Sequence, residues 1–369
     1  MSAAATTLLP TWDIYCRVVD NFGDAGVLWR LARRLATGRR RRVRLRIDRI
    51  DTLAVLVPGA ARGTIIDDVR IEDWTASDDA DLPDVLVTGF DCAPPPEMRA
   101  WMRPGKPLWI TVEHLSAEPW VTRFHGSPSP KPDGCVEHFF YPGFSPGTGG
   151  LLLEPGVLVD RDEAIARPPT TSRRLLAFCY ADSPLALLLR GCRHDAAHHG
   201  QRTWEVIVPS PSAGARNCGR SLAPGVRLSR VPFVAQSEFD RRLRDCDVNF
   251  VRGEDSWVRA IWAARPFVWQ AWRQELPTRS AKVEAFLESQ AGWLDAASHD
   301  PLAWLSRWWN GLSGPIAPTA AAVAARLAAV VEATPRICPR LCAWGDALAE
   351  RELATELIRF AVAQSGRQL

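Results

Sequence analysis

The stretch Trp12-Asp-Ile-Tyr-Cys-Arg-Val-Val-Asp-Asn-Phe-Gly-Asp24 decides how the fold of this chain is interpreted. Its first part, Trp12–Val19, is rich in β-branched and aromatic residues, which is typical of a strand. Asp20–Asp24 has the composition of a turn, and Gly23 can adopt a positive φ. Apolar residues then recur at helical spacing over Val27–Leu35, with arginines between them. A strand, a loop and a helix in this order predict the start of a parallel α/β sheet.

The same alternation continues along the chain and predicts two successive α/β series. Further strands of the first series are expected at Val43–Ile47, Asp84–Thr88 and Leu108–Val112. The second series is expected to contain strands at Arg174–Tyr180, Trp204–Val208, Asp247–Val251 and Pro266–Gln270, with a helix over Trp257–Ala264. Two more helices are expected over Ala320–Glu332 and Ala343–Val362. Two series of this kind predict two doubly wound domains with a cleft between them.

The domain boundary is expected between the two series. Residues 125–150 form a loop-rich stretch, and residues 155–172, rich in Pro, Arg and Asp, have the composition of a linker. We therefore expect an N-terminal domain at 1–165 and a C-terminal domain at 166–344. The helix at about 345–369 is expected to pack back on the first domain.

Composition excludes several classes of protein. The 369 residues contain no run of 18 charge-free apolar residues, and the N-terminus has no signal-peptide pattern. A net charge of +3 gives no indication of a nucleic-acid or membrane partner. The nine cysteines form no C-x-x-C pair, which favours reduced thiols in a cytoplasmic protein. Oligomeric state cannot be read from the sequence, so a monomer is the default expectation.

In doubly wound sheets, ligands bind beyond the carboxyl ends of the strands. This rule selects three loops as candidate sites: Asp20–Asp24, Tyr180–Pro184 and Arg252–Ser256. In the first loop, two carboxylates flank a glycine before a helix. They can act as a base or a ligand clamp, or Asp24 can simply cap the helix.

The Arg252–Ser256 loop places a guanidinium, a glycine and a potential Ser N-cap at a helix start, where anions are favoured. Its two acids can instead accept from sugar hydroxyls or face a cation, or the loop can be only a capped helix. Phe178 and Tyr180 share one strand face, and Phe233 follows another strand. These rings can stack a nucleobase or belong to the core.

Other motifs give weaker indications of function. Gly143–Gly147 matches the serine-hydrolase pattern G-x-S-x-G, but Pro146 has no N–H to offer an oxyanion hole. His194 and His198 lack a third metal ligand, and Cys338 and Cys342 lack a second pair to complete a zinc site. The run Arg39–Arg46 can attract an anionic partner, or it can be a solvated loop before a strand.

Five blocks of sequence together resemble one family, the protein-arginine rhamnosyltransferases that modify translation elongation factor P. The blocks are Cys16-Arg-Val-Val-Asp-Asn-Phe-Gly-Asp-Ala-Gly-Val27, Glu113-His-Leu-Ser-Ala-Glu118, Phe139-Phe-Tyr-Pro-Gly-Phe144, Thr148-Gly-Gly-Leu-Leu152 and Asn249-Phe-Val-Arg-Gly-Glu-Asp-Ser256. The resemblance implies a GT-B fold, with two Rossmann-like domains facing each other across a cleft. It implies that the N-terminal domain (1–165) binds the acceptor and that the C-terminal domain (166–344) binds the nucleotide sugar. It also implies inverting transfer of L-rhamnose from dTDP-β-L-rhamnose to an arginine of elongation factor P, without a metal or other cofactor.

The resemblance also assigns site residues by motif. Asp20 and Asp24 are the implied catalytic aspartates. We interpret Asp20 as the general base, Asp24 as orienting the loop or sharing positive charge, and Glu254 as holding the acceptor or a sugar hydroxyl. The expected donor-binding residues are Asn21, Phe22, Gly23, Phe178, Tyr180, Phe233, Gln236, Arg252, Gly253, Glu254, Asp255, Ser256 and Trp272. Trp272 replaces a tyrosine usual in the family, and the family pattern is also lost at Pro277–Ser280.

Two other hypotheses stay open on the sequence. One is a GT-B nucleotide-sugar transferase with a different donor or acceptor, which a thermal-shift screen of dTDP-, UDP- and GDP-sugars would distinguish. The other is a non-catalytic module that binds a nucleotide sugar or a translation factor. The paired aspartates Asp20 and Asp24 argue against the second hypothesis.

Overall fold

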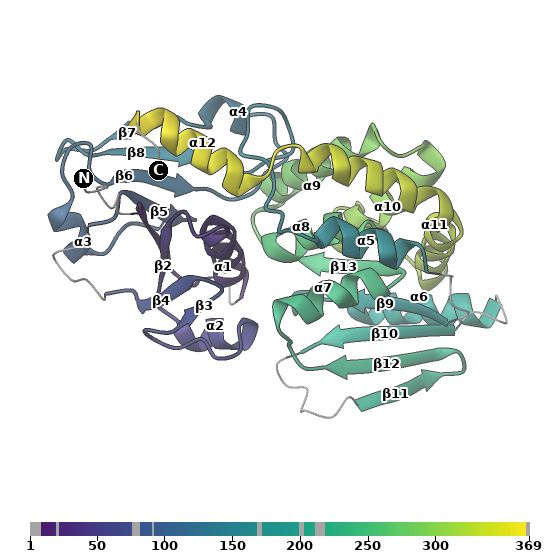
Figure 1. Cartoon of the computed structure of the whole chain (residues 1–369). Coiled ribbons are helices and arrows are strands. Elements are labelled where there is room, and N and C mark those ends of the chain that lie inside the picture. The colour runs from purple at the N-terminus through teal and green to yellow at the C-terminus, as the bar shows by residue number, and fades with distance from the viewer. Residues whose placement is uncertain are drawn as a thin grey trace. The chain divides into compact units, whose positions relative to one another are not determined.

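A computed structural model of the chain describes residues 9–19, 22–75, 82–90, 92–167, 172–198, 203–210 and 218–366. The chain forms two compact units, Met1–Glu154 with Ala349–Leu369, and Pro155–Leu348 (Figure 1). The first unit therefore ends at Glu154, earlier than the expected boundary at residue 165.

The reason for the earlier boundary is a helix where a linker was expected. Helix α5 (Val157–Ile165) packs within the second unit. Its Arg161 is buried and its Nη1 donates to Asp346 at 2.8 Å, and Arg265 Nη2 donates to the carbonyl of Ala164 at 2.9 Å. These contacts bind α5 to the second unit, so the prediction of a linker over 155–172 is wrong for this part of it.

The first unit contains an eight-stranded sheet in the order β3-β4-β2-β1-β5-β6-β8-β7. The pairs β3–β4 and β7–β8 are antiparallel, and the other pairs are parallel. The elements are β1 (Thr11–Cys16), α1 (Gly23–Ala36), β2 (Arg42–Ile47), α2 (Ile50–Leu56), β3 (Ile65–Ile66), β4 (Val69–Asp73), β5 (Val85–Gly89), α3 (Pro96–Trp101), β6 (Leu108–Val112), α4 (Val121–Phe124), β7 (Pro128–Pro130), β8 (Val136–Phe140) and α12 (Leu353–Ser365). The predicted strands near 12, 43, 84 and 108 are thus confirmed, and β7 and β8 lie where only a loop was expected.

The C-terminal helix α12 belongs to the first unit, where it runs along β6 and β8 (Figure 1). Leu353, Leu357 and Ala361 are buried in the same core as α1. Gly150 has a φ of +71°, and a Cβ there would overlap the backbone carbonyl of Arg351. The glycines of the Thr148–Leu152 block therefore let the chain approach closely where α12 begins.

The helix boundaries near the C-terminus differ from those expected. Helix α11 (Ala320–Ala349) continues through Pro335 and Pro339, whereas the sequence analysis ended a helix at Glu332 and began another at Ala343. The break falls at 350–352 instead. Glu352 is the N-cap of α12, and its carboxylate accepts from the backbone N–H groups of Ala354 and Thr355.

The second unit contains a six-stranded sheet in the order β11-β12-β10-β9-β13-β14, parallel except for β11. Besides α5 and α11, its elements are β9 (Ser172–Ala177), α6 (Leu185–His198), β10 (Thr203–Pro209), β11 (Cys218–Ala223), β12 (Val226–Val231), α7 (Gln236–Asp245), β13 (Val248–Arg252), α8 (Glu254–Ala263), β14 (Phe267–Gln270), α9 (Leu276–Ala291) and α10 (Ala296–Trp309). The second predicted α/β series is therefore confirmed, although β9 ends at Ala177 and not at Tyr180.

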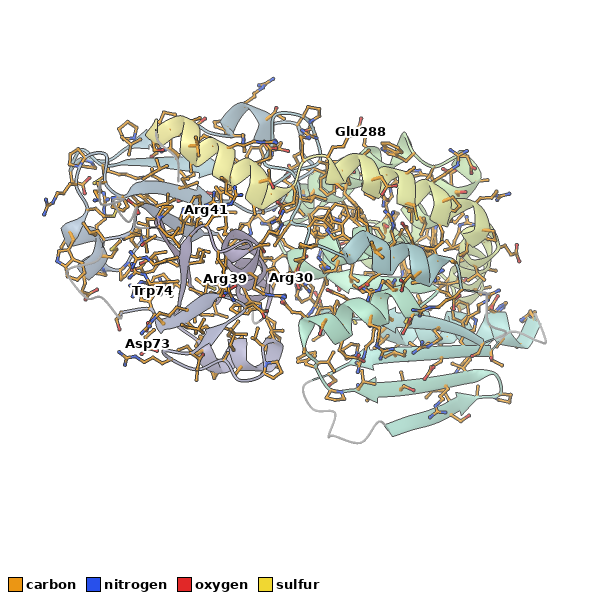
Figure 2. The ribbon with its side chains drawn as sticks, viewed as in Figure 1. Arg30, Arg39, Arg41, Asp73, Trp74 and Glu288 are labelled. Carbon is orange, nitrogen blue, oxygen red and sulfur yellow. The ribbon has the colours of Figure 1, made fainter. Side chains whose placement is uncertain are left out.

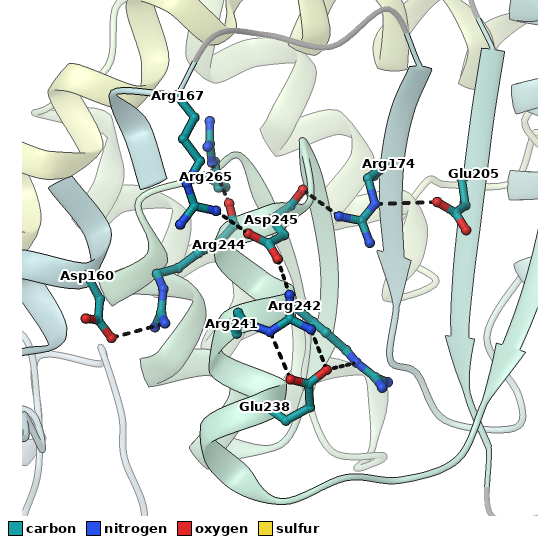
Figure 3. Close-up of polar contacts among 10 residues, drawn as sticks. All are labelled: Asp160, Arg167, Arg174, Glu205, Glu238, Arg241, Arg242, Arg244, Asp245 and Arg265. Atoms are coloured by element: carbon teal, nitrogen blue, oxygen red, sulfur yellow. Dashed lines mark hydrogen bonds and ion pairs between the residues drawn. The ribbon is translucent and has the colours of Figure 1, made fainter. Parts of the chain in front are cut away.

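A network of ion pairs lies at the amino ends of the strands of the second unit (Figure 3). Arg167 and Arg241 both reach the carboxylate of Asp245, at 2.8 and 2.7 Å, and Arg244 reaches Asp160 at 3.1 Å. These contacts join the end of α7 to α5 and to the start of β9. Arg167, Arg241 and Arg244 each have a carboxylate partner here, so the network stabilises structure.

Within the part of the chain that the structure describes, no helix is both long and apolar enough to span a membrane. The cysteines whose side chains are described are all free thiols.

Candidate functional site

The topology of the second sheet marks one crevice. Strand β9 lies between β10 on one side and β13 on the other, so the strand order reverses between β9 and β13. Ligands of doubly wound sheets bind at this reversal, beyond the carboxyl ends of the strands. The two loops that follow these strands contain Phe178 and Tyr180, and Gly253.

Arg252, at the carboxyl end of β13, contacts the aromatic residues that follow β9. Its guanidinium carbon lies 4.7 Å from the ring centre of Phe178 and 4.6 Å from that of Tyr180. No carboxylate among the described residues forms an ion pair with it. Ring faces attract a guanidinium through their quadrupole and leave its net charge in place. The arrangement holds a half-buried cation that is available to an anion.

The Phe178 ring is shared between this site and the core. It contacts Phe233 edge-on with ring centres 6.1 Å apart, and Phe239 with centres 5.2 Å apart. Packing of Phe178 against other rings is therefore confirmed, and stacking of a nucleobase on it stays a prediction. The contact of Phe239 with Phe178 was not predicted. The position of Phe239 in the first turn of the helix that follows Phe233 could have indicated it.

Tyr180 is fixed by a side chain that the sequence analysis missed. Gln270, the last residue of β14, accepts through Oε1 from the Tyr180 backbone N–H at 3.1 Å and from Ser183 Oγ at 2.8 Å. The Tyr180 ring meets the ring of Trp272 edge-on at 5.2 Å between centres. Gln270 is the last residue of the predicted strand Pro266–Gln270, and this position at its carboxyl end could have identified it.

The turn between β13 and α8 requires its glycine. Gly253 is the N-cap of α8, with φ of +67° and ψ of −173°, a region that residues with a Cβ avoid. The expected N-cap, Ser256, is instead in the first turn, and its hydroxyl donates to the Arg252 carbonyl and accepts from the Arg252 N–H. Ser256 therefore braces Arg252 and does not cap the helix.

The acids after Gly253 occupy the first turn of α8. Glu254 and Asp255 are both partly buried there, and Gln236 Nε2 donates to Asp255 Oδ2 at 3.5 Å. Gln236 is the first residue of α7. A buried ion pair between Arg259 and Asp240, at 3.0 Å, also connects α8 to α7. Contacts thus connect six of the predicted donor residues into one group: Phe178, Tyr180, Phe233, Arg252, Ser256 and Trp272. Gln236 and Asp255 form a separate pair.

The loop after β1 is the corresponding edge of the first unit. Asp20 and Asn21 lie outside the described residues. Phe22 is the N-cap position of α1, Gly23 is the first helical residue, and Asp24 lies in the first turn. Asp24 therefore does not cap the helix, and its Oδ2 accepts from the backbone N–H of Val19 at 2.7 Å.

Three more side chains lie at this edge of the first sheet. Asp48, directly after β2, accepts from the Val18 N–H at 2.9 Å. Phe90 and His114, which follow β5 and β6, stack with ring centres 4.9 Å apart. Burial, with Asp24 and Asp48 nearby, raises the pKa of the Cys16 thiol well above its usual range, so Cys16 stays protonated. The sequence analysis quoted His114 in a motif but gave it no role.

Among the described residues, no group of three or more His, Cys, Asp and Glu side chains is placed to hold a metal ion. The pair His194 and His198 stacks ring on ring at 4.1 Å between centres.

Comparison with known proteins identifies a family. The model of the family described as elongation factor P (EF-P) rhamnosyltransferase EarP matches residues 12–362. A protein-arginine rhamnosyltransferase of Pseudomonas putida is 38% identical over 339 residues, which cover 81% of this chain and 86% of that protein. One from Neisseria meningitidis is 34% identical, over 76% of this chain and 78% of that protein.

Solved structures agree with this result. A structure described as the basis for EarP-mediated arginine glycosylation of translation elongation factor EF-P is 25% identical, with a TM-score of 0.60, over 95% of this chain and 98% of that chain. The calicheamicin glycosyltransferase CalG4 matches at a TM-score of 0.54 with 13% identity, over 98% of this chain and 99% of that one, and shows the fold alone. The fold is therefore GT-B, an α/β architecture of two Rossmann-like units.

Proposed function

Because the chain belongs to the EarP family of EF-P rhamnosyltransferases, we propose that it transfers L-rhamnose from dTDP-β-L-rhamnose to an arginine side chain of EF-P. The transfer inverts the anomeric configuration.

The observation that carries the proposal is the environment of Arg252. Its guanidinium lies over Phe178 and Tyr180 at the sheet reversal, with no carboxylate pairing it among the described residues. A nucleoside diphosphate leaving group develops negative charge as its bond to the sugar breaks. A preorganised guanidinium beside the start of α8 stabilises that charge, together with backbone N–H groups there. The proposed reaction uses no metal.

The remaining side chains of this edge suit the nucleoside. Phe178 and Phe233 offer ring faces and edges to a pyrimidine base, at about 1–3 kcal/mol per stacked base. Gln236 supplies an amide that is already hydrogen-bonded to Asp255. Glu254 and Asp255 can accept from sugar hydroxyls, and Trp272 is exposed beside Tyr180. Because Trp has no hydroxyl, its contribution to donor binding is packing or a single N–H donation.

The acceptor needs a base. An arginine side chain is a cation with N–H donors and no basic lone pair, so one nitrogen must lose a proton as it attacks. In the proposed step the C–N bond to the anomeric carbon forms, the bond from that carbon to the diphosphate oxygen breaks, and Asp20 takes the proton. Carboxylates can also hold the planar guanidinium by paired hydrogen bonds. Glu254 is a further candidate for this role.

Asp24 acts as a positioning residue in this scheme. Its Oδ2 accepts from the N–H of Val19, the residue that precedes Asp20 in the sequence. Two substitutions separate this role from a role of its charge. Asp24→Asn keeps an oxygen for the Val19 N–H and removes the charge, whereas Asp24→Ala removes both. We expect the Asn variant to keep most of its kcat and the Ala variant to lose about 10-fold or more, the cost of one buried hydrogen bond. Equal losses would instead assign the charge of Asp24 to the reaction.

The direct test is the intact mass of EF-P after incubation with this protein and dTDP-rhamnose. We expect EF-P to gain one deoxyhexosyl residue on an arginine. UDP- and GDP-sugars in parallel reactions test the alternative of another donor, and EF-P with its acceptor arginine changed to lysine is the acceptor control. Unmodified EF-P with the dTDP donor, or transfer only from another nucleotide sugar, would contradict the proposal.

The base is tested by Asp20→Asn, with transfer and donor binding measured separately. We expect transfer to fall by about 100-fold or more, as for loss of a general base, while dTDP-rhamnose binding stays within a few-fold of the wild type. Near-normal transfer would remove Asp20 from this role. Lost donor binding would show a structural defect instead.

The free thiols of the described cysteines fit a reducing compartment, and we propose the cytoplasm as the site of the reaction.

A further inference from the structure

One face of the first sheet has a composition that is unusual for a parallel sheet. Val43, Leu45 and Ile47 of β2 are buried in the core that contains α1. Because side chains alternate along a strand, Arg42, Arg44 and Arg46 point to the opposite face. The run Arg39–Arg46 is compatible, on sequence, with an anionic contact or with a solvated loop before a strand. The structure places five of its eight residues, 42–46, in β2.

The neighbouring strands β4 and β1 also place charged residues on this face. Arg70 of β4 lies in register with Arg44, and Asp13 of β1 lies on its other side. Arg42, Arg44 and Arg46 of β2 and Arg70 of β4 line a hollow of about 1050 Å³, which we call the arginine face. Every residue that lines it belongs to a strand or a loop. Figure 2 labels two lining residues that come from the loop before β2, Arg39 and Arg41, within the first unit.

Positive charge exceeds negative charge on this face. Among the described residues, seven arginines but only two acids line the hollow, and these acids are paired: Asp68 with Arg39 at 3.1 Å and Glu72 with Arg70. Beneath them, the buried carboxylate of Asp13 serves two guanidinium groups, those of Arg44 and Arg46, the latter at 2.8 Å. The Arg46 side chain is only 7% exposed, and its Nη1 has no hydrogen-bond partner in the described part of the chain. Burial and the neighbouring Arg40 lower the pKa of Arg41, which also indicates crowded positive charge.

Parallel sheets are normally covered on both faces. Here α1 packs on one face of β1, β2 and β4, and residues of α3 cover the other face only near Tyr15 and Trp109. Beyond Tyr15 the second face carries arginines in place of the apolar side chains that a covering helix would need. A partner that covers this face must therefore bring negative charge.

We propose that the arginine face is a docking surface for an extended acidic segment of a partner protein. Same-face side chains of a strand repeat every 6.6–6.8 Å or so, which is the spacing of Arg42, Arg44 and Arg46 along β2. An extended polypeptide with carboxylates at alternate positions has the same repeat, so successive carboxylates meet successive guanidinium groups. Arg–carboxylate pairs of this kind are bidentate and specific in geometry.

The rim of the face favours a polypeptide over a nucleic acid. Leu9 and Ile65 line it with 44% and 64% of their surfaces exposed, and these apolar groups suit the intervening side chains of a peptide. No aromatic side chain is among the described residues that line the face, whereas single-stranded nucleic acids are held by stacked aromatic rings as well as by cations. This inference does not depend on the proposed transferase activity.

The test uses fluorescently labelled poly-L-glutamate and poly-uridylate as probes in anisotropy titrations of the full chain at two salt concentrations. The variant Arg42→Gln/Arg70→Gln removes two exposed guanidinium groups and leaves Asp13 with its partners. The matched control, Arg103→Gln/Arg123→Gln, removes two exposed arginines of the same unit outside the face. We expect poly-L-glutamate to bind the wild type with salt-sensitive affinity, about 10-fold more weakly to the Arg42/Arg70 variant and unchanged to the control.

Three results would overturn the proposal. The first is tighter binding of poly-uridylate than of poly-L-glutamate, lost in the same variant, which would make the face a nucleic-acid site. The second is equal losses in the variant and the control, or no binding of either probe. The third involves Asp78, Asp79 and Asp81, which follow β4 in the sequence and lie outside the described residues. Binding that occurs only after all three are changed to Asn would mean that the chain's own acids compete for the face.

Discussion

Arginine has two different environments at opposite edges of the second sheet. At the amino ends of the strands, Arg167, Arg241 and Arg244 each reach a carboxylate within 3.1 Å (Figure 3). At the carboxyl ends, Arg252 lies over two aromatic rings and pairs with no carboxylate in the described part of the chain. The first environment neutralises charge between neighbours, and the second holds a cation in place while leaving its charge for a ligand.

The comparison shows that local partners identify a binding arginine better than residue type does. The chain contains 45 Lys and Arg residues, and only three of these are Lys, so arginine as such indicates nothing. What distinguishes Arg252 is its position at the sheet reversal and the Ser256 hydroxyl that fixes its backbone. The predictions below test whether this distinction is one of function.

The largest expected effect is on turnover. Arg252→Gln should lower kcat by about 100- to 1000-fold, the loss seen when one preorganised donor to a developing negative charge is removed. Arg167→Gln, which removes an arginine of the ion-pair network, should leave kcat within two-fold or so, since exposed pairs contribute at most about 1 kcal/mol to stability. Steady-state transfer to EF-P measures both. Similar kcat values for the two variants would remove the distinction between the edges.

The next effect is on donor affinity. Tyr180→Leu removes one of the rings under Arg252 and should weaken dTDP binding by about 5- to 30-fold, equivalent to the 1–2 kcal/mol of a partly desolvated cation–π contact. Trp304→Leu is the matched control, because Arg326 lies over Trp304 at 5.5 Å elsewhere in the same unit. Calorimetric titration of dTDP into each variant checks the difference. A loss of affinity in both variants would attribute it to stability.

A smaller effect is expected within the ion-pair network. Arg241 and Glu238 are paired at 2.8 Å one turn apart on α7. A double-mutant cycle with Arg241→Ala and Glu238→Ala should give a coupling free energy of about 0.2–0.5 kcal/mol in urea unfolding. The dTDP affinity should not change in any of the three variants. A change would mean that this edge of the sheet influences the ligand edge.

The smallest effect depends on pH. Hydrogen bonds from Arg241 lower the pKa of Glu238 below its ordinary value. A carboxyl with a lowered folded-state pKa stabilises the protein above its unfolded-state pKa, and this stabilisation is lost as the pH falls through the folded-state value. The wild type should therefore be slightly more stable than Glu238→Gln at pH 7, and the difference should shrink below about pH 4. Urea unfolding at several pH values measures it, and a difference that grows with acidity would contradict the assignment.

Much of the fold could be predicted because its signals are local. Hydrophobic strands such as Leu108–Val112 need only their own residues to be recognised, and β6 has these bounds. Helix α11 could not be predicted correctly, because packing of the residues around Pro335 and Pro339 overrides the usual effect of proline on a helix. The linker prediction failed for the same kind of reason, since Arg161 of α5 is held by Asp346, far along the chain.

The candidate site was predicted in part. Phe178, Tyr180 and Arg252 could be selected because each lies at or just beyond the end of a predicted strand, where ligands of such sheets bind. Gln270 meets the same criterion and was missed, because its role is a contact with the backbone of Tyr180 that no sequence motif shows. The bonds of Ser256 and Asp24 to nearby backbone groups also depend on loop geometry, and helix capping, one of the alternatives left open for both residues, is wrong.

The most direct test of the account is the affinity of dTDP for Arg252→Gln compared with Arg244→Gln, each measured by isothermal titration calorimetry. Arg244 belongs to the ion-pair network, where it meets Asp160. We expect about 10- to 100-fold weaker binding for Arg252→Gln, the cost of lost charged hydrogen bonds, and wild-type binding for Arg244→Gln. Wild-type affinity in the Arg252 variant would contradict the claim that this arginine holds the diphosphate.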